Sequence, residues 1–411
     1  MTHYDYLIIG GGIAGVTAAE TIREVNQTAS IGIVSQEPHM IYSRVLLPSY
    51  LKKRISREQV FLRRAEDFTK KGIDFRLSEE VSKVDTGRRE ITLTSGLALG
   101  YEKLIITSGG RVNPWGVEEE KEFVYRLQTL DDADRLYAAL PKIEKPFVVG
   151  SSFISLEFLE VFFLNKSPAV LLSQKGRFFS KMLEEKGGEM MRNNFERHNI
   201  PSYFEDSIQD IKKKEKELAL STGKFKSFSC DAIAVGVGII RNIGFLEGSG
   251  IRVGEKGILV NEYLETNQPD VFAAGDVAEY NDLILGSQHS VGNWTNAFLQ
   301  GKRVGYNVAG RKEPFKNVSA YSITNLGFQI TALGEFSETA EKIVRIDEAR
   351  EQYERFFIES GTLRGAVLLN RFADKPYLAK LIETQAPVDD YRAKLTSFEF
   401  DINNIPVYTG Q

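Results

Sequence analysis

The sequence predicts an α/β protein that has two domains built on parallel sheets and a separate α+β domain at its C-terminal end. Three observations predict this fold. A short apolar run leads directly into a glycine-rich turn and a helix within the first 25 residues. The same succession of strand, turn and helix returns after Pro146. From Tyr321 onward the sequence changes to short strands separated by turns, which is typical of a different kind of domain.

Length and charge narrow the class of protein. The chain has 411 residues, 42% of them hydrophobic, which is an ordinary globular composition and predicts about two to four domains. Its 52 basic and 56 acidic residues give a formal charge of −4, which argues against nucleic acid as a partner. No apolar run reaches the roughly 18 residues of a membrane span, so we expect no membrane partner. Because the chain enters a strand at once, without a signal peptide, we expect a cytoplasmic location.

The single cysteine, Cys230, limits the possible chemistry. One cysteine forms neither an internal disulfide nor a redox-active pair. It also does not supply a cysteine-ligated zinc or iron–sulfur centre within one chain, so we expect no metal. The simplest interpretation of Cys230 is a small buried hydrophobic residue.

The clearest motif lies between the first strand, which ends at Ile9, and a second apolar run that leads to Glu37. The turn after Ile9 fits G-x-G-x-x-G. Its first glycine permits a tight turn, its second lets a phosphate approach the backbone, and its third lets helix and strand pack closely. The pyrophosphate would sit at the start of the helix, and the acid would accept hydrogen bonds from a ribose. The candidate binding residues are Gly10, Gly12, Ile13, Ala14, Gly15 and Glu37.

The segment between Arg44 and Arg64 is strongly basic. It contains a single acid, Glu58, and seven basic residues, namely Arg44, Lys52, Lys53, Arg54, Arg57, Arg63 and Arg64. Two interpretations stay open. The segment is either a solvated helix face or a docking surface that attracts an acidic partner protein.

Short strands are predicted next, over 81–84, 90–93 and 103–106, with glycines as breakers. Val81 begins the first of them and is a candidate cofactor contact. The last strand ends in Thr107, Ser108 and Gly109. A helix then opens with Thr129 as its N-cap.

The opening pattern returns after Pro146. A strand over 147–149 is followed by a loop from Gly150 to Glu157, a very apolar helix to Leu164 and a second strand over 169–172. Two copies of this plan predict two Rossmann-like three-layer dinucleotide-binding domains. The expected domains are 1–116 and 244–318 (two parts of the first), 117–243 (the second) and 319–411 (a C-terminal α+β interface domain).

A third motif combines a strand with Gly275 and Asp276. An apolar strand that ends in Gly-Asp places a carboxylate and free backbone amides where ligands bind in open α/β sheets. A helix that contains Trp294 follows. Beyond it we expect strands over 322–333, 342–346, 353–358 and 363–369, and a helix over 375–383.

Together these motifs resemble the FAD-dependent pyridine nucleotide-disulfide oxidoreductases. The turn at 10–15 resembles the FAD-binding motif, 107–109 the A-T-G turn, 272–276 the second FAD motif and 363–367 the L-R-G-A-V of the interface domain. The disulfide-reducing members carry a reactive cysteine near residues 42–48, and this chain has none there. The segment instead resembles the rubredoxin and ferredoxin reductases. It is most similar to the flavin module of assimilatory nitrite reductase, whose motif reads Y-S-R-V-L-L-P.

The resemblance implies roles for several residues. Arg44 would lie near the FAD phosphates, Trp294 near the flavin, and Asp276 would hold the ribityl chain. Glu157, with Gly150 and Ser152 in the second loop, would bind and orient the nicotinamide nucleotide. A lysine that is common in these reductases is replaced here by Ser49.

The second loop departs from the G-x-G-x-x-G pattern at two positions, Ser152 and Ser155. A serine at the second position adds an atom where the pyrophosphate approaches, and one at the third pushes strand and helix apart. Ser173 or Gln174 stands where an NADH-selecting acid is expected. Two basic residues, Lys175 and Arg177, then either meet a 2′-phosphate or form a plain basic loop. A weak NADH site, a tolerant NADPH site and a domain without nicotinamide binding all stay open.

The function we expect is that of an FAD-dependent oxidoreductase. It would pass electrons from NADH or NADPH through FAD to a small acidic one-electron acceptor protein of the rubredoxin or ferredoxin type, docked near Arg44–Arg64. The cofactor supplies the chemistry and the protein orients it, so no catalytic cysteine or histidine is needed. One alternative is an FAD-binding subunit with a degenerate nicotinamide site, and another is an oxidase that uses O₂. The interface domain is compatible with a homodimer.

Overall fold

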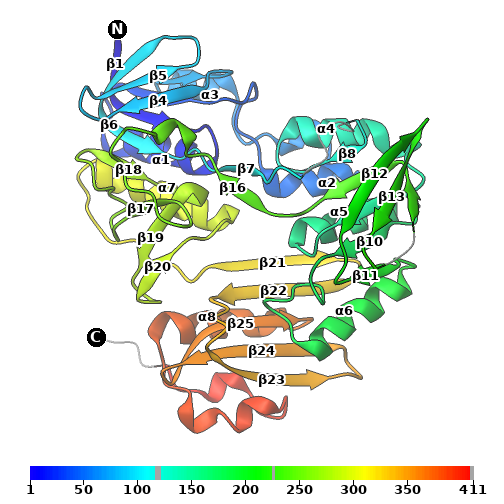
Figure 1. Cartoon of the computed structure of the whole chain (residues 1–411). Helices are drawn as coiled ribbons and strands as arrows, with labels where there is room; N and C mark the ends of the chain where they lie inside the picture. The colour runs from blue at the N-terminus through cyan, green and yellow to red at the C-terminus, as the bar shows by residue number, and fades with distance from the viewer. Residues whose placement is uncertain (116–121, 225–226, 408–411) are drawn as a thin grey trace. The chain divides into compact units, whose positions relative to one another are not determined.

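The computed structural model describes residues 1–115, 122–224 and 227–407 (Figure 1). The chain divides into two compact units, each assembled from separate stretches. Unit 1 comprises Met1–Leu46, Ser56–Arg111 and Ile239–Ser319, and unit 2 comprises Leu47–Ile55, Val112–Gly238 and Ala320–Gln411. The expected domain boundary between residues 116 and 117 lies outside the described residues.

The main sheet of unit 1 has seven strands, in the order β3-β2-β1-β6-β5-β4 with β18 also paired to β6. The strands are β1 (Thr2–Ile9), β2 (Ile31–Val34), β3 (Ile73–Arg76), β4 (Val81–Asp85), β5 (Glu90–Leu93), β6 (Ala98–Ile106) and β18 (Val271–Ala273). β1, β2, β3, β6 and β18 are parallel, and Ile8 lies opposite Ile33 on one side and Ile105 on the other. β4 and β5 add an antiparallel hairpin. The C-terminal ends of β1 and β6 and all of β2 and β18 are buried, and these stretches are apolar apart from Tyr6 and Gly32.

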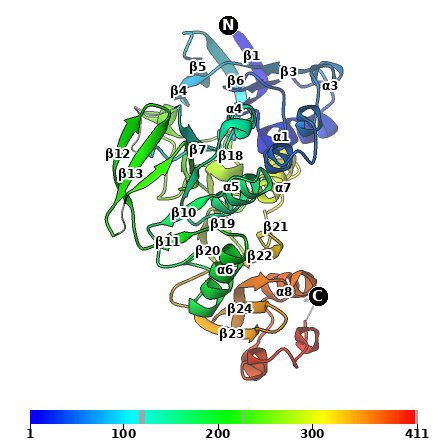
Figure 2. The ribbon, with the colours of Figure 1, turned by 90° about the vertical axis from the view of Figure 1, so that its right-hand side faces the viewer.

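Two helices of unit 1, α1 (Ile13–Val25) and α7 (Trp294–Val308), lie against each other (Figures 1 and 2). A methyl group built on Gly301 would lie 2.4 Å from the carbonyl oxygen of Ala14, and one built on Gly305 would lie 2.7 Å from Cβ of Thr21. Glycine at these two positions therefore allows the close approach. Unit 1 also contains α3 (Ala65–Lys70) and a small sheet of β17 (Ile258–Val260), β19 (Ala278–Asp282) and β20 (Ser287–His289). β7 (Gly110–Val112) and β16 (Ile239–Arg241) pair with each other.

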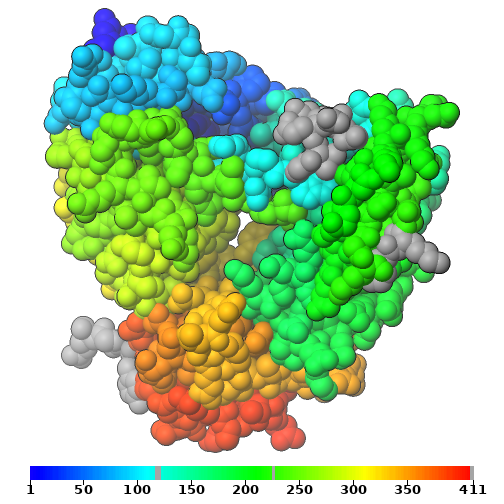
Figure 3. All heavy atoms as spheres, viewed as in Figure 1, coloured from blue at the N-terminus to red at the C-terminus, as the bar shows by residue number. Residues whose placement is uncertain are grey.

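Unit 2 begins with a five-stranded parallel sheet in the order β11-β10-β9-β15-β8. Its strands are β8 (Val124–Tyr125), β9 (Pro146–Val149), β10 (Val170–Ser173), β11 (Ser202–Phe204) and β15 (Ala232–Val235). The helices that accompany it are α4 (Leu130–Ala139), α5 (Phe153–Leu164) and α6 (Glu185–Arg197). Thr129 caps α4 by accepting the N–H of Asp132 at 3.1 Å, as predicted. The antiparallel strands β12 (Ile208–Lys214), β13 (Glu217–Thr222) and β14 (Phe228–Cys230) follow, at the green edge of the space-filling view (Figure 3). β12 is largely exposed, whereas Leu218 and Leu220 of β13 are buried.

The short helix α2 (Leu47–Leu51) belongs to unit 2 although it follows the first motif in sequence. The ring of Tyr50 stacks on that of Tyr137 in α4 with 4.7 Å between centroids, and the Tyr50 hydroxyl donates to Asp134 at 2.9 Å. These contacts attach the segment that contains Lys52 to the second dinucleotide-type domain.

The C-terminal part of unit 2 is an antiparallel sheet in the order β21-β22-β25-β24-β23. Its elements are β21 (Ala320–Asn325), β22 (Phe328–Gly334), β23 (Glu341–Asp347), β24 (Gln352–Glu359), β25 (Thr362–Leu369) and α8 (Lys375–Thr384). The stretch expected over 322–333 is a hairpin of two strands, because Leu326 and Gly327 both have positive φ angles and turn the chain. The predicted fold class, two dinucleotide-binding domains with a C-terminal α+β domain, is confirmed.

Candidate functional site

The glycine-rich turn of unit 1 joins β1 to α1. Gly10 has a φ of +111°, and a methyl group built on it would lie 2.3 Å from the carbonyl oxygen of Thr107. A methyl group on Gly15 would lie 2.1 Å from the carbonyl oxygen of Gly10. At Gly12, by contrast, no described atom lies within 4 Å of such a methyl group. Gly10 and Gly15 are therefore fixed by packing, whereas Gly12 leaves open space for a phosphate.

The start of α1, at Ile13 and Ala14, faces this open space. Its N-cap residue, Gly12, makes no side-chain hydrogen bond, and the first turn has no acidic residue. The first N–H groups of the helix therefore lack a side-chain cap and lie at the positive end of the helix dipole. This arrangement fits a pyrophosphate.

Glu37, after β2, is held by two neighbours. Nη2 of Arg44 lies 2.5 Å from its Oε1, and the hydroxyl of Tyr42 donates to the same carboxylate. The N–H of Ser78 donates to the carbonyl oxygen of Glu37 at 3.2 Å, so β4 begins beside Glu37. The side chain of Val81 is buried in the core of unit 1. The structure thus brings Glu37, Arg44 and the start of β4 together.

The second motif forms a 3₁₀ turn (Gly275–Val277) directly after β18. The N–H of Gly275 donates to Oε1 of Gln300 in α7 at 2.7 Å. Burial raises the pKa of Asp276, and the positive charges of Arg241 and Arg44 oppose that shift. Arg44 therefore acts on both acids of the site. Sequence reasoning missed Gln300 and gave Arg241 no role, because neither belongs to a recognisable motif.

Thr107 and Ser108 have different partners. The Thr107 hydroxyl lies 3.0 and 3.1 Å from the carbonyl oxygens of Ile9 and Gly10, and thus supports the glycine turn. The Ser108 hydroxyl donates to the carbonyl oxygen of Asn242 at 2.7 Å, and the N–H of Asn242 donates to Gly109 at 3.0 Å. Ser108 and Gly109 are therefore fixed to the chain that returns into unit 1.

Trp294 is the first residue of α7 and is partly exposed. Gly292, two residues earlier, lies close to the second motif, since a methyl group built on it would lie 3.7 Å from Oδ2 of Asp276. The start of α7 and Asp276 therefore belong to one region of unit 1.

The corresponding turn of unit 2 joins β9 to α5. Gly150 has a φ of +120°, and a methyl group on it would lie 2.4 Å from the carbonyl oxygen of Gly236. Ser152 is the N-cap of α5. Its hydroxyl accepts the N–H of Ser155 at 3.3 Å and donates to the carbonyl oxygen of Gly236 at 2.9 Å. The start of α5 is thus capped by its own side chain, unlike the start of α1.

The second departure, Ser155, is fully buried. Its Oγ lies 3.2 Å from Oγ of Ser152 and 3.4 Å from the carbonyl oxygen of Gly236. A methyl group on Gly236 would lie only 2.3 Å from Oγ of Ser155. The expectation that Ser155 separates strand from helix is wrong, because Gly236, directly after β15, provides the space that Ser155 fills.

The loop after β10 carries the residues expected to choose between nucleotides. Ser173 is 2% exposed, and its Oγ accepts the N–H of Lys175 at 3.1 Å. Gln174 and Lys175 are exposed. Arg177 donates to the carbonyl oxygen of Leu183 at 3.4 Å, so it is attached to its own loop. Of the two candidate basic residues, Lys175 is the one that extends into solvent.

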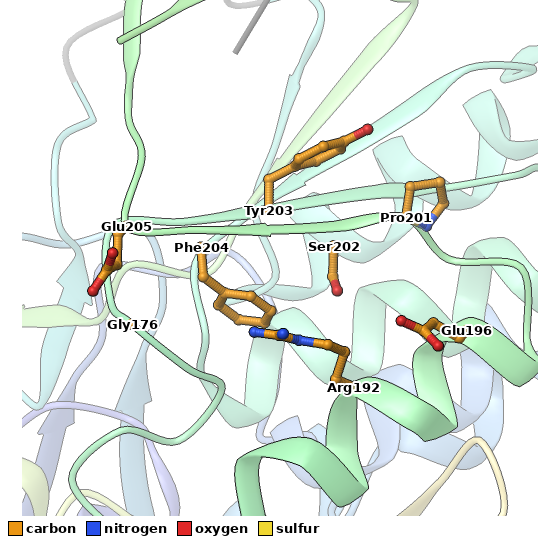
Figure 4. A pocket seen from close by; sticks show the side chains of 8 residues that line it. All are labelled: Gly176, Arg192, Glu196, Pro201, Ser202, Tyr203, Phe204 and Glu205. Atoms are coloured by element: carbon orange, nitrogen blue, oxygen red, sulfur yellow. The ribbon is translucent and has the colours of Figure 1, made fainter. Parts of the chain in front are cut away.

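A pocket of about 550 Å³ lies beside this loop (Figure 4). It is lined by Gly176, Arg192, Glu196, Pro201, Ser202, Tyr203, Phe204 and Glu205. The guanidinium of Arg192 lies over the Phe204 ring, 5.3 Å from its centroid. Glu205 forms an ion pair with Lys224 at 3.0 Å. The pocket borders the edge strand β11 and does not include the turn at 150–155.

Glu157 lies in the second turn of α5 and is nearly buried. Its Oε2 lies 2.5 Å from Nζ of Lys52 and accepts a hydrogen bond from Asn325 at 2.8 Å. Lys52 is one of the seven basic residues predicted to form a solvated face or docking surface, and its side chain is only 4% exposed. That expectation is wrong for Lys52.

The other basic residues of 44–64 divide between the two units. Several have acidic partners within the chain, namely Arg44 with Glu37, Arg54 with Glu160 and Arg63 with Glu20. Lys53 and Arg64 are exposed. Much of the positive charge of this segment is therefore neutralised within the protein.

The model of the pyridine nucleotide-disulphide oxidoreductase family matches residues 4–301. The chain belongs to this family. The model of the rubredoxin NAD+ reductase C-terminal domain matches residues 322–386. Family membership identifies the chain as an oxidoreductase with FAD and NAD(H) as its cofactors. The open space at Gly12 and the uncapped start of α1 fit the flavin dinucleotide.

Several relatives of the family align over most of the chain. It is 25% identical over 389 residues to the 3-phenylpropionate/cinnamic acid dioxygenase ferredoxin–NAD(+) reductase component of Photorhabdus laumondii, with 94% of this chain and 98% of that protein covered. It is 24% identical over 400 residues to NADH-rubredoxin oxidoreductase of Clostridium acetobutylicum, with 97% and 98% covered. It is 25% identical over 391 residues to a nitrite reductase of Bacillus subtilis, with 93% of this chain and 48% of that protein covered.

Solved structures share the fold of this chain. The reductase in the covalent putidaredoxin reductase–putidaredoxin complex has a TM-score of 0.91 at 20% identity, with 98% of each chain covered. A ferredoxin reductase of Rhodopseudomonas palustris has a TM-score of 0.89 at 22% identity, with 97% of this chain and 99% of that chain covered. Among the described residues, no helix has the length and apolar character needed to cross a membrane. The described part of the chain also contains no group of three or more His, Cys, Asp or Glu side chains suited to a metal ion.

Proposed function

We propose that this chain is an FAD-dependent reductase that passes electrons from NAD(P)H to a small one-electron acceptor protein of the rubredoxin or ferredoxin type. The observation that carries the proposal is a flavin site in a chain without a reactive cysteine. Cys230 lies in β14, is 1% exposed, and burial raises the pKa of its thiol to about 12. Because a thiol in this state is unreactive, electrons have no disulfide relay within the chain. Relatives named as ferredoxin and rubredoxin reductases support the same conclusion.

The proposal assigns a role to each candidate residue. FAD, when bound, accepts a hydride from the nicotinamide and releases electrons singly to the acceptor. We assign its binding to Gly10, Gly12, Ile13, Ala14, Gly15, Glu37, Arg44, Val81, Thr107, Ser108, Gly109, Gly275 and Asp276. Trp294 lies near the flavin in this proposal, and Gly150, Ser152 and Glu157 bind the nicotinamide nucleotide. The proposal includes three domains, namely an FAD-binding domain of 1–116 with 244–318, an NAD(P)-binding domain of 117–243 and an interface domain of 319–411.

An anaerobic titration of the flavin-loaded protein with NADH and then NADPH tests the first half of the reaction. We expect stoichiometric bleaching of the flavin absorbance by NADH within seconds. Bleaching by NADPH alone would reassign the nucleotide to the phosphorylated form and make Lys175 its contact. Reduced protein is then mixed with oxidised rubredoxin or ferredoxin, and reoxidation of the flavin identifies the acceptor class.

The rival proposal is an FAD-binding component whose nicotinamide site no longer works. The capped start of α5 favours it, because the Ser152 hydroxyl already accepts the N–H of Ser155, one of the first N–H groups of the helix that would otherwise be open to a pyrophosphate. In that case neither nucleotide bleaches the flavin, while dithionite does. The two outcomes of one titration therefore separate the two proposals.

For the acceptor, we propose docking near the 44–64 segment, at its exposed residue Arg64 in unit 1. The internal ion pairs of Arg44, Arg54 and Arg63 limit the attraction that the segment exerts. We therefore expect Arg64→Glu to raise the KM for an acidic acceptor about threefold at low salt, and the effect to vanish at high salt. Lys380→Glu, at an exposed position of α8, is the control. We also propose that the protein is cytoplasmic, which cell fractionation checks. We propose further that it forms a homodimer, which light scattering checks.

A further inference from the structure

The loop between β10 and α6, residues 174–184, contacts the C-terminal sheet of unit 2. Nη1 of Arg355 in β24 donates to the carbonyl oxygen of Met182 at 3.1 Å. On the same face of β24, the buried ring of Tyr353 lies 3.0 Å from a methyl group built on Gly187, in the first turn of α6. The start of α6 and β24 are therefore neighbours (Figures 1 and 2). The loop thus begins at the parallel sheet of unit 2 and ends against its antiparallel sheet.

The last part of this loop is a tight turn that two arginines hold. The carbonyl oxygen of Phe179 accepts the N–H groups of Met182 and Leu183 at 2.7 and 2.9 Å. Arg355 donates to the carbonyl oxygen of Met182, and Arg177 donates to the next one, that of Leu183, at 3.4 Å. Phe179 has a φ of +50°, a conformation that costs free energy in a residue with a bulky side chain. The turn therefore depends on contacts from outside it, and Arg355 supplies one of them from β24.

The same turn determines where the earlier residues of the loop lie. A methyl group built on Gly188 would lie 3.1 Å from Cδ of Arg177, so the Arg177 side chain packs directly on α6. The ring of Phe179 lies 4.6 Å from that of Phe153, the first residue of α5, between centroids. The loop after the second strand and the start of the first helix are the two places where a dinucleotide contacts a domain of this kind. A shift of the turn would therefore reach both.

Arg355 is a costly residue if it serves stability alone. Its Nε is buried and has no hydrogen-bond partner among the described residues. A buried N–H without a partner loses its contacts with water and gains nothing in exchange. The guanidinium otherwise lies over the ring of Phe357, 5.0 Å from its centroid, a contact that an apolar side chain would also make. The hydrogen bond to Met182 is the contact for which a donor is needed at this position.

We propose that Arg355 is a positioning residue for the adenosine half of the nicotinamide nucleotide. By holding the carbonyl oxygen of Met182, it keeps the 174–184 loop in one conformation, so that the nucleotide meets a site that is already formed. A loop that adopts other conformations binds with an affinity reduced by the fraction of time spent in them. This inference rests on the proposed function, because it requires that unit 2 binds the nucleotide. It gives the C-terminal sheet a part in nucleotide binding.

The test compares Arg355→Met with the wild-type protein, both loaded with FAD. Calorimetry with ADP-ribose, which has the adenosine half of NADH but no nicotinamide, measures binding without turnover. We expect the Kd for ADP-ribose to rise about fivefold to tenfold in Arg355→Met, because the loop is no longer held. In anaerobic bleaching, the NADH concentration that gives half the maximal rate should rise by the same factor. The maximal rate should stay unchanged, because the hydride step does not involve the adenosine half.

Two further variants separate positioning from stability. Arg355→Lys keeps a positive donor near the carbonyl oxygen of Met182 and should regain part of the affinity. Arg350→Met, in the exposed turn between β23 and β24, is the matched control and should behave as wild type in every measurement. Melting temperatures and flavin content show whether each variant is folded. If Arg355→Met does not fold, Arg355→Gln, which is polar but too short to reach Met182, takes its place with the same expected rise in Kd.

The outcomes separate two kinds of failure. If wild-type flavin is not bleached by either nucleotide, the proposed function is wrong and the role of Arg355 is wrong with it. If NADH bleaches the wild type but ADP-ribose does not bind, or binds Arg355→Met equally well, only the role of Arg355 is wrong. A lower maximal rate in Arg355→Met with an unchanged Kd for ADP-ribose would also overturn it.

Discussion

The two strand–turn–helix motifs of this chain have the same backbone conformation at the first glycine of the turn, but they carry different side chains at the third position. Gly10 and Gly150 have φ angles of +111° and +120°, and a methyl group on either would meet a carbonyl oxygen at 2.3 or 2.4 Å. At the third position, unit 1 has glycine on the helix and a hydroxyl residue opposite it, and unit 2 has the reverse arrangement. Gly15 faces Thr107 in unit 1, whereas Ser155 faces Gly236 in unit 2. The backbone conformation thus requires glycine at the first position of the turn. The residue at the third position depends on the size of the residue that lies opposite it.

The second position differs in function rather than in packing. Gly12 leaves the start of α1 uncapped and open, and Ser152 caps the start of α5. A capped helix is more stable by itself, but its N–H groups are less available to a phosphate. The comparison therefore predicts tight dinucleotide binding in unit 1 and weaker binding in unit 2.

The largest effects are expected at the shared first glycine. Gly10→Ala and Gly150→Ala should each destabilise the protein by about 3 kcal/mol, because the new methyl group meets a carbonyl oxygen at a positive φ. Gly10→Ala should also lose FAD, whereas Gly150→Ala should retain it. Thermal unfolding and flavin content check both. Loss of FAD in Gly150→Ala alone would contradict the independence of the two motifs.

The exchange at the third position predicts a strong coupling. Gly236→Thr should cost about 2 kcal/mol, because its side chain would overlap Ser155. Ser155→Gly should restore most of that stability in the double variant, which would then carry the Gly–Thr pair of unit 1. Denaturant unfolding of the two single variants and the double variant measures the coupling as a double-mutant cycle. Additive effects would mean that the two positions do not compensate each other.

Removing the Ser152 cap from the start of α5 tests whether the cap weakens binding of the nucleotide. Ser152→Gly should cost only a few tenths of a kcal/mol, because glycine is a tolerated N-cap. It should lower the KM for NADH about threefold by freeing the N–H of Ser155 at the start of α5. The reciprocal variant, Gly12→Ser, should weaken FAD binding. Steady-state kinetics and flavin titration measure the pair, and an unchanged KM in Ser152→Gly would show that the cap does not compete with the nucleotide.

The smallest effect concerns the pH dependence of FAD binding in unit 1. Burial raises the pKa of Asp276 above its usual 3.8, so in acid the carboxyl is protonated and accepts hydrogen bonds from FAD more weakly than the carboxylate does. FAD affinity should therefore fall as pH decreases through the raised pKa, by at most about tenfold per pH unit. Asp276→Asn should bind FAD more weakly and without this pH dependence. Fluorescence titration at several pH values checks it.

Local sequence patterns predict those parts of the site that are formed by residues close together in the chain. The turn at 10–15, the acid at Glu37 and the Gly275–Asp276 turn each lie within one short segment, where spacing alone dictates strand, turn and helix. Gly236 was not recognised as the partner of Ser155, because 81 positions separate them in the chain. The sequence likewise groups Lys52 with exposed basic residues, because Glu157, the carboxylate with which it pairs, is 105 positions away. Charge patterns in sequence carry no information about such distant partners.

The close packing of α1 against α7 determines when unit 1 can fold during synthesis. Ala14 and Thr21 of α1 meet Gly301 and Gly305, and β18 completes the sheet beside β6. β1 can pair with β2 and β6 once residue 106 has been made. In contrast, α1 meets Gly301 and Gly305 only after the ribosome has produced α7. Until then the face of α1 that packs on α7 has no native partner while residues 112–238 of unit 2 emerge, and such long-range closure is slow. We therefore expect the helix of the clearest motif to complete its packing late in synthesis.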